Sequence, residues 1–239
     1  MTKVQITLRD AQHILQRFEI KPLTGDDAPA YFALRQRILQ MGDGHYFSDS
    51  YTREAQLVTE QQRRDWCTEK PEHCIIGAFA NGVLSGIVMI TRFGPPADST
   101  VEWEAAWVDP RYRRTGLTKA IYQEVQKWTV GQGYGFVKVF IRADNTRWLD
   151  IRRRQGFVQI GTKSNETWAD GTIGDTHVFT LDLRAPALEQ RRQRTLQHLD
   201  ETVASLTQGA NAPPVHCKRD TVQTVPGHVR PRPKEGRLG

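Results

Sequence analysis

The chain has 239 residues, of which 38% are hydrophobic and 25% charged, a composition that fits a globular protein with one sizeable α/β domain. Its formal net charge at pH 7 is +6, and residues 209–239 carry most of it because they hold six basic and only two acidic side chains. The remaining residues are close to neutral, so the overall charge does not by itself indicate a nucleic-acid partner.

The first part of the chain predicts a strand, two helices and a hairpin. In order, we expect a strand over 18–23, a helix from Asp26 or Asp27 to about residue 40, a loop over 41–51 and a helix over 53–68. The apolar runs 74–80 and 83–92 then predict a β-hairpin, because the dipeptide Asn81-Gly82 between them tolerates the positive φ of a tight turn.

The following segments alternate between strand and helix patterns. In order, they predict a strand over 101–108, a helix from about 117 to 131, a strand over 136–141, a helix from about 146 to 155 and a hairpin of 157–162 with 172–183. Leu117, Ile121, Val125 and Trp128 share one helical face. The near-continuous apolar run over 136–141 is typical of a strand covered on both faces.

The C-terminal part has a different character. Residues 186–208 predict one more helix, whose narrow apolar stripe consists of Leu196, Leu199, Val203 and Leu206. Residues 209–239 contain five prolines and no aromatic residue, so we expect them to be disordered. The expected organisation is an N-terminal extension (1–17), one domain (18–184), a C-terminal helix (185–208) and a basic tail (209–239).

Other features limit the function classes. Cys67, Cys74 and Cys217 have neither Cys-x-x-Cys spacing nor a set of histidine partners, so we expect no metal site and no disulfide framework. The N-terminus has no apolar core of a signal peptide, and the longest apolar stretch, 83–90, is too short to cross a bilayer. We therefore expect a cytoplasmic protein without a membrane partner.

The most informative segment is the turn between strand 101–108 and the next helix. A strand that leads through a turn into a helix N-terminus directs several backbone N–H groups to one point, where the helix dipole favours an anion. Gly116 allows a phosphate to approach the backbone, and Arg111, Arg113 and Arg114 can neutralise it. The segment is neither a Walker loop nor a dinucleotide fingerprint. A basic turn that only caps a helix is the alternative.

Two blocks carry a resemblance to a known family. Val108-x-Pro110-x-Tyr112-Arg113-Arg114-x-Gly116-Leu117 resembles the acetyl-CoA pyrophosphate loop of the GNAT superfamily of N-acetyltransferases. Arg113, Gly116 and Thr118 fall on its Arg/Gln-x-x-Gly-x-Gly/Ala positions, and Thr118 is bulkier than the usual last residue. The segment from Asn145 to Gly156-Phe157 is similar to a later block of the family, in which an Asn lies near the pantetheine arm. Together with the order of elements, the resemblance covers about residues 18–183.

The resemblance implies a fold, an acyl donor and a set of residues that bind it. The fold is α/β (α+β), with a central mixed, mostly antiparallel sheet of about seven strands flanked by helices, and a C-terminal helix added. The donor is acetyl-CoA, with no metal. The residues implied to bind it are Trp107, Val108, Arg113, Arg114, Thr115, Gly116, Leu117, Thr118, Asn145 and Arg152.

Glu102 and Glu104 are the candidate general bases. They alternate with Trp103 along the strand, so both carboxylates project from one face and raise each other's proton affinity. In the enzymes that the chain resembles, a general base commonly lies at one of these two strand positions. We favour Glu104 slightly over Glu102. The alternative is a pair of solvated charges at the edge of the strand.

Arg152 marks a departure from the family pattern. Many GNAT enzymes have a tyrosine at this position, which protonates the leaving thiolate, and no tyrosine occurs between Asn145 and Phe157 here. An arginine cannot act as that proton donor, although its charge can stabilise a thiolate. The alternative is a basic helix face that meets solvent or the adenosine phosphate of the cofactor.

The expected reaction is direct attack of a primary amine on the acetyl thioester. His45, Tyr46 and Phe47 lie in the loop where this superfamily usually builds the acceptor pocket, although they equally suit a local cluster that anchors the loop. Two other functions stay open: acylation of a macromolecule (a protein lysine, an N-terminus or a nucleic acid), or CoA binding without catalysis. Homodimerisation, and docking of a nucleic acid or acidic partner by the basic tail, also stay open.

Overall fold

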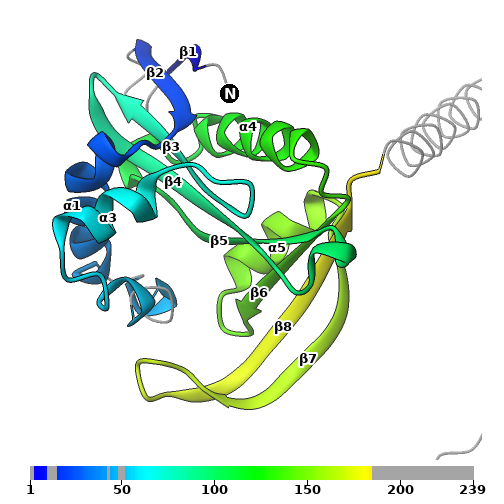
Figure 1. The fold of residues 1–239 in the computed structure, drawn as a ribbon. Coiled ribbons are helices and arrows are strands. Elements are labelled where there is room, and N and C mark those ends of the chain that lie inside the picture. Colours follow the sequence, from blue (N-terminus) through cyan, green and yellow to red (C-terminus); the bar gives the residue numbers. More distant parts are fainter. Residues whose placement is uncertain (1–2, 10–14, 42–43, 48–51, 185–239) are drawn as a thin grey trace, which may run out of the picture. The chain divides into compact units, whose positions relative to one another are not determined.

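The computed structural model describes residues 3–9, 15–41, 44–47 and 52–184. They contain an eight-stranded sheet with the strand order β1-β2-β3-β4-β5-β6-β8-β7 (Figure 1). The strands are β1 (Val4–Arg9), β2 (Leu15–Pro22), β3 (His73–Ala80), β4 (Val83–Arg92), β5 (Thr100–Val108), β6 (Phe136–Arg142), β7 (Val158–Thr167) and β8 (Ile173–Asp182). Only β5 and β6 are parallel neighbours, which confirms the expected mixed, mostly antiparallel sheet.

Helices cover both faces of this sheet (Figure 1). They are α1 (Ala28–Leu39), α3 (Glu60–Cys67), α4 (Leu117–Gly131) and α5 (Thr146–Arg154), with short 3-10 helices at η1 (Gly25–Asp27), η2 (Gly44–Phe47), η3 (Pro96–Asp98) and η4 (Pro110–Tyr112). One apolar cluster joins the sheet to α4 and α5, and a second joins it to α1 and α3. Burial of these two clusters is the main stabilising contribution to the domain.

The observed elements differ from the expected ones in two places. The helix expected over 53–68 is interrupted, and α3 begins at Glu60. Thr59 and Gln62 form a capping box there, since the Thr59 hydroxyl accepts from the Gln62 N–H at 3.1 Å and the Gln62 side chain accepts from the Thr59 N–H at 2.9 Å. In addition, Val4–Arg9 of the expected extension forms β1, which pairs antiparallel with β2 and adds an eighth strand.

The sheet opens between β5 and β6. These strands pair over only three residues, Thr100–Glu102 with Phe136–Lys138, and then separate. On the other side of β5, the register with β4 shifts between Glu104 and Trp107, which places a β-bulge at Ala105, whose φ is 49°. The C-terminal half of β5 therefore faces a gap in the sheet on one side and carries a bulge on the other.

The expected C-terminal helix and basic tail, 185–239, lie outside the described residues. All of the described residues belong to one compact unit, residues 1–192. Across the described ranges, no helix is both long enough and apolar enough to pass through a bilayer. Those same ranges contain no group of three or more His, Cys, Asp or Glu side chains arranged around a common metal position.

Candidate active site

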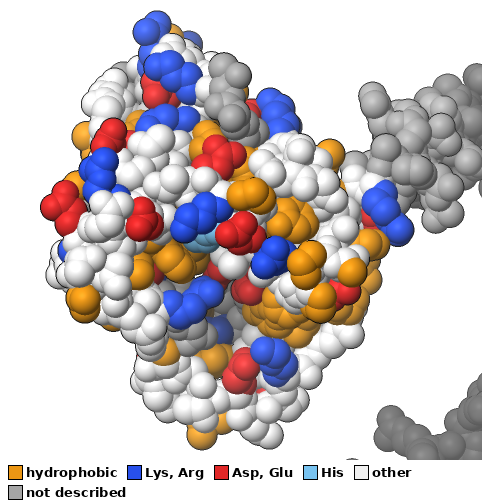
Figure 2. Space-filling model, viewed as in Figure 1, with side chains coloured by type: hydrophobic (Ala, Val, Ile, Leu, Met, Phe, Trp, Pro, Cys, Tyr) orange, Lys and Arg blue, Asp and Glu red, His pale blue; other side chains and the backbone are white. Residues whose placement is uncertain are grey.

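Two adjoining cavities lie beside the C-terminal half of β5. The first has a volume of about 500 Å³ and the second about 450 Å³. They share five lining residues, Tyr46, Phe47, Ala106, Asn145 and Trp148, so they form one cleft. Figure 2 shows a hollow in this face of the molecule with both basic and acidic side chains around its rim. We call the first of these cavities the acceptor cavity and the second the donor cavity, after the amine acceptor and the acyl donor expected from the sequence.

The start of α4 has the geometry of an anion site. Gly116 is its N-cap residue, with a φ of 97° and no side chain to satisfy the first backbone N–H groups of the helix. The Thr115 hydroxyl fixes the turn, because it donates to the Tyr112 carbonyl at 2.8 Å and accepts from the Leu117 N–H at 3.3 Å. The N-terminus of this helix of 15 residues, whose N-cap residue contributes no side-chain hydrogen bond, favours a phosphate at this position.

Most of the residues expected to bind the donor lie at this cleft. Trp107, Val108, Arg113, Thr118 and Asn145 line the donor cavity, and the bulky Thr118 is accommodated as part of its wall. Arg113 is held by a hydrogen bond from its Nε to the Val108 carbonyl, at 2.9 Å. The donor cavity therefore extends from the N-terminus of α4 along β5 to the N-terminus of α5.

The other expected donor residues have different positions. Arg114 and Gly116 form the turn with positive φ angles, and Leu117 is fully buried in the core beneath it. Arg111 was also expected to neutralise a phosphate. Its guanidinium donates to both carboxylate oxygens of Asp109, at 3.0 and 2.9 Å, and is thus already paired.

Asn145 connects the donor cavity to the acceptor cavity. It is the N-cap residue of α5, and its side-chain oxygen accepts from the Trp148 N–H at 3.4 Å. This bond uses the oxygen, so the side-chain amide can donate to a ligand. The next residue of the same helix face, Trp148, also lines both cavities.

Glu102 and Glu104 both line the acceptor cavity, on one face of β5 as expected. Burial, together with the neighbouring charge of Glu104, raises the pKa of Glu102 to about 7. Glu104 instead forms an ion pair with Arg53 through one of its carboxylate oxygens. The geometry therefore favours Glu102 over Glu104 as a base that works near neutral pH.

The loop residues His45, Tyr46 and Phe47 form η2 and line the acceptor cavity. Phe47 is buried, and Arg35 holds it by a hydrogen bond to its carbonyl at 3.3 Å and by packing 5.4 Å from its ring centroid. His45 and Tyr46 pack against each other, with ring centroids 3.9 Å apart. The structure thus combines the two expectations for this loop, because an anchored cluster also forms a cavity wall.

A buried ion pair fixes the segment that carries Arg53. Glu54 is 2% exposed and accepts hydrogen bonds from the Tyr31 hydroxyl at 2.7 Å and the Arg35 Nε at 2.9 Å. Both donors belong to α1. This contact joins α1 to residues 52–54 and so positions the neighbouring Arg53 at Glu104.

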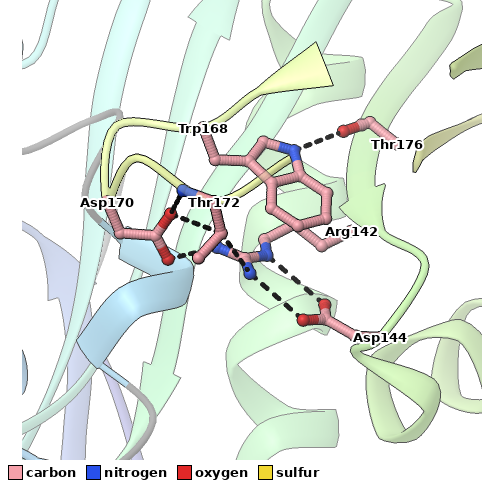
Figure 3. A network of polar contacts seen from close by, with 6 residues as sticks. All are labelled: Arg142, Asp144, Trp168, Asp170, Thr172 and Thr176. Atoms are coloured by element: carbon pink, nitrogen blue, oxygen red, sulfur yellow. Dashed lines mark hydrogen bonds and ion pairs between the residues drawn. The ribbon is translucent and has the colours of Figure 1, made fainter. Parts of the chain in front are cut away.

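Arg142, at the end of β6, holds the hairpin that forms the far wall of the acceptor cavity (Figure 3). Its guanidinium lies 3.6 Å from the ring centroid of Trp168. It donates to Asp170 at 2.8 Å and to Asp144 at 3.3 and 3.1 Å. The Trp168 indole donates to Thr176 at 2.9 Å. These contacts connect β6 to the tip of the β7–β8 hairpin and make this wall rigid.

Arg152 lines the acceptor cavity and is only 3% exposed. The alternative of a basic helix face in solvent is therefore wrong for this residue. Sequence patterns also did not indicate several cavity residues that come from distant elements, namely Arg53, Arg142, Lys163, Glu166 and Trp168. Their contribution depends on tertiary contacts. The only local signal was the pattern that predicted the hairpin of 157–162 with 172–183, whose turn follows Trp168.

Comparisons with known proteins indicate one family and one fold. Residues 41–157 match the acetyltransferase (GNAT) family. An acetyltransferase of the GNAT family from Streptococcus pneumoniae has a TM-score of 0.57 at 19% identity, over 69% of this chain and 99% of that one. An N-acetyltransferase from Staphylococcus aureus Mu50 has a TM-score of 0.57 at 20% identity, over 70% and 99%.

Two further relatives add context. A putative acetyltransferase from Salmonella typhimurium, solved with its cofactor acetyl-CoA, has a TM-score of 0.55 at 16% identity, over 70% of this chain and 94% of that one. An uncharacterised protein of Mycobacterium leprae is 25% identical over 162 residues, a match that spans 66% of this chain and only 42% of that protein. Residues 41–157 thus match the acetyltransferase (GNAT) family, and the described fold is that of GNAT acetyltransferases.

Proposed function

We propose that this protein transfers the acetyl group of acetyl-CoA to a primary amine by direct attack of that amine. One observation carries the proposal: Glu102, a carboxylate with a pKa raised to about 7, lines a cavity that adjoins the donor cavity. A base with this pKa is about half ionised near pH 7, and its carboxylate form accepts a proton readily.

The donor cavity has the features that acetyl-CoA requires. The N-terminus of α4 offers backbone N–H groups to a pyrophosphate, with Arg113 and Arg114 as cations beside it. The apolar wall of Trp107 and Val108, followed by Asn145, suits an extended arm with amide groups. When bound, acetyl-CoA supplies the activated acetyl thioester.

The residues of the chain have separate roles in this proposal. Glu102 takes the proton of the attacking amine. The bulge residues Ala105 and Ala106 line the cavity, where a backbone N–H can donate to the carbonyl oxygen of the acetyl group. Tyr46 and Trp148 enclose the junction of the two cavities and limit the access of water.

A volume of about 500 Å³ favours a small amine or a single amino-acid side chain as the acceptor. Acylation of a macromolecule and CoA binding without catalysis are the competing functions. Homodimerisation, and docking of a partner by residues 209–239, stay predictions.

The test is acetyl-CoA-dependent thiol release with a panel of amines, peptides and nucleic acids as acceptors. With the best acceptor, we expect Glu102→Gln to lower kcat at least about a hundredfold. Glu166→Gln, which replaces another carboxylate of the same cavity, is the matched control and should retain turnover. Near-normal turnover of both Glu102→Gln and Glu104→Gln from pH 6 to 9 would place the base elsewhere. CoA binding without thiol release from any acceptor would favour the inactive module.

A further inference from the structure

Arg152 is a buried cation whose surroundings are mainly aromatic. Its guanidinium carbon lies 4.5 Å from the ring centroid of Tyr122, 5.1 Å from that of Phe157 and 5.2 Å from that of Trp148. It donates to the Tyr122 hydroxyl at 2.5 Å and to the side-chain oxygen of Gln155 at 2.9 Å. Its Nε is buried and has no hydrogen-bond partner. Because a guanidinium stays charged at all relevant pH values, this is a permanent buried positive charge.

Arg152 differs from the other cations that line the acceptor cavity. Arg53 is paired with Glu104, Lys163 lies 3.3 Å from Glu166, and Arg142 lies 2.8 Å from Asp170. In the described part of the chain, the hydrogen-bond partners of Arg152 are the neutral side chains of Tyr122 and Gln155, and no carboxylate lies within ion-pair distance. Aromatic faces compensate a buried cation only in part. A ligand that places an anion here would supply the missing counter-charge.

The position of Arg152 identifies the part of a ligand that it can reach. Asn145, Trp148 and Arg152 are spaced by three and four residues and lie on one face of α5. Asn145 and Trp148 line both cavities, and Arg152 lines the acceptor cavity. Arg152 therefore lies one helical turn beyond the junction at which donor and acceptor must meet.

The proposed reaction creates one anion at this junction. As the amine nitrogen bonds to the acetyl carbon, the bond between that carbon and sulfur breaks, and sulfur leaves with the electron pair. Glu102 takes the proton of the amine, so the products are the amide, a protonated Glu102 and a thiolate. Given the proposed function, we infer that Arg152, oriented by Tyr122, is the electrostatic partner of the CoA thiolate. Arg152 transfers no proton, and the thiolate gains one from water after release.

The test compares the affinity of CoA with that of desulfo-CoA, which lacks the sulfur, by calorimetry from pH 6.5 to 9.5. Other charged and titratable groups face Arg152 or its cavity. They are Tyr122 on α4, Glu102 and Glu104 on β5, Arg53, His45 and Tyr46 beside them, Arg142 on β6, and Lys163 and Glu166 on β7. Their titration affects both ligands, so the ratio of the two affinities isolates the sulfur.

We expect the ratio to rise in favour of CoA as the pH increases towards the pKa of a free thiol, about 8.5. For each unit by which the site lowers the pKa of the CoA thiol, the ratio of CoA affinity to desulfo-CoA affinity increases about tenfold at alkaline pH. Arg152→Gln should make the ratio independent of pH, Arg152→Lys should restore part of the rise, and Tyr122→Phe should reduce it. Arg154→Gln removes an equal charge from the exposed side of the same helix and should leave the ratio unchanged.

The wild-type protein alone can overturn this inference, so the test does not depend on the folding of a variant. A ratio that stays constant with pH means that the site does not favour the thiolate. A ratio that falls means that the site favours the neutral thiol over the thiolate. A rise that survives in Arg152→Gln assigns the role to another cation. If neither ligand binds, the proposed function fails together with the inference, whereas binding of both without a pH-dependent ratio overturns the inference alone.

Discussion

Replacing Glu102 with glutamine should stabilise the fold at alkaline pH. The pKa of Glu102 rises from an ordinary value of 4.5 to about 7, first because the side chain is buried and second because Glu104 carries the same charge. The folded protein therefore holds this proton more tightly than the unfolded chain. The protonated Glu102 side chain makes its full contribution to the free energy of unfolding below about pH 4.5, and this contribution is lost as the pH rises to about 7. A shift of this size corresponds to about 3 kcal/mol of lost stability above pH 7.

Urea denaturation at pH 5 and pH 8 measures this difference. The Glu102→Gln variant keeps the shape of the side chain and removes its charge. The difference in free energy of unfolding between the variant and wild type should therefore be about 2 kcal/mol larger at pH 8 than at pH 5, in favour of the variant. Glu166→Gln is the matched control. Its carboxylate lines the same cavity but is 35% exposed and beside Lys163, so we expect a change of less than about 0.5 kcal/mol at both pH values. An equal effect of Glu102→Gln at both pH values would refute the reasoning, because it would show that the carboxylate is not desolvated.

Three further predictions concern the donor site, the core and the cavity wall. Gly116→Asp should weaken CoA binding at least about tenfold by calorimetry, whereas Gly133→Asp, which also has a positive φ of 85°, should not. Glu54→Gln leaves Arg35 as a buried cation without its carboxylate and should cost about 3–5 kcal/mol in chemical denaturation, and a cost below about 1 kcal/mol would contradict this. Gly174→Ala places a methyl group 2.4 Å from Trp168, so we expect a higher KM for the acceptor with unchanged CoA affinity.

Local signals predicted the order of elements and the donor loop. The turn at Asn81-Gly82 is confirmed, with φ angles of 50° and 80°. The start of a helix directly after Gly116 is also confirmed, with Gly116 as its N-cap residue. Two other features also have local signals in the sequence, although they were not predicted. They are the start of α3, marked by the capping box of Thr59 and Gln62, and β1, marked by alternating apolar residues.

The electrostatics of the acceptor cavity could not be predicted in this way. The preference between Glu102 and Glu104 depends on Arg53, which is 51 residues away from Glu104 in the chain. The burial of Arg152 depends on Tyr122, 30 residues earlier. A charge pattern in the sequence shows which groups titrate, but burial and long-range partners decide in which direction each pKa moves.

The three-residue pairing between β5 and β6 has a mechanical consequence. It divides the sheet into two parts, β1–β5 and β6–β8, which are joined only by the main-chain hydrogen bonds of this short pairing. Beyond these three residues, β5 and β6 are not paired with each other. A bound arm with amide groups can form hydrogen bonds with the main chain of both strands there. Binding of the acyl donor should therefore slow amide hydrogen exchange most in the C-terminal half of β5 and in β6.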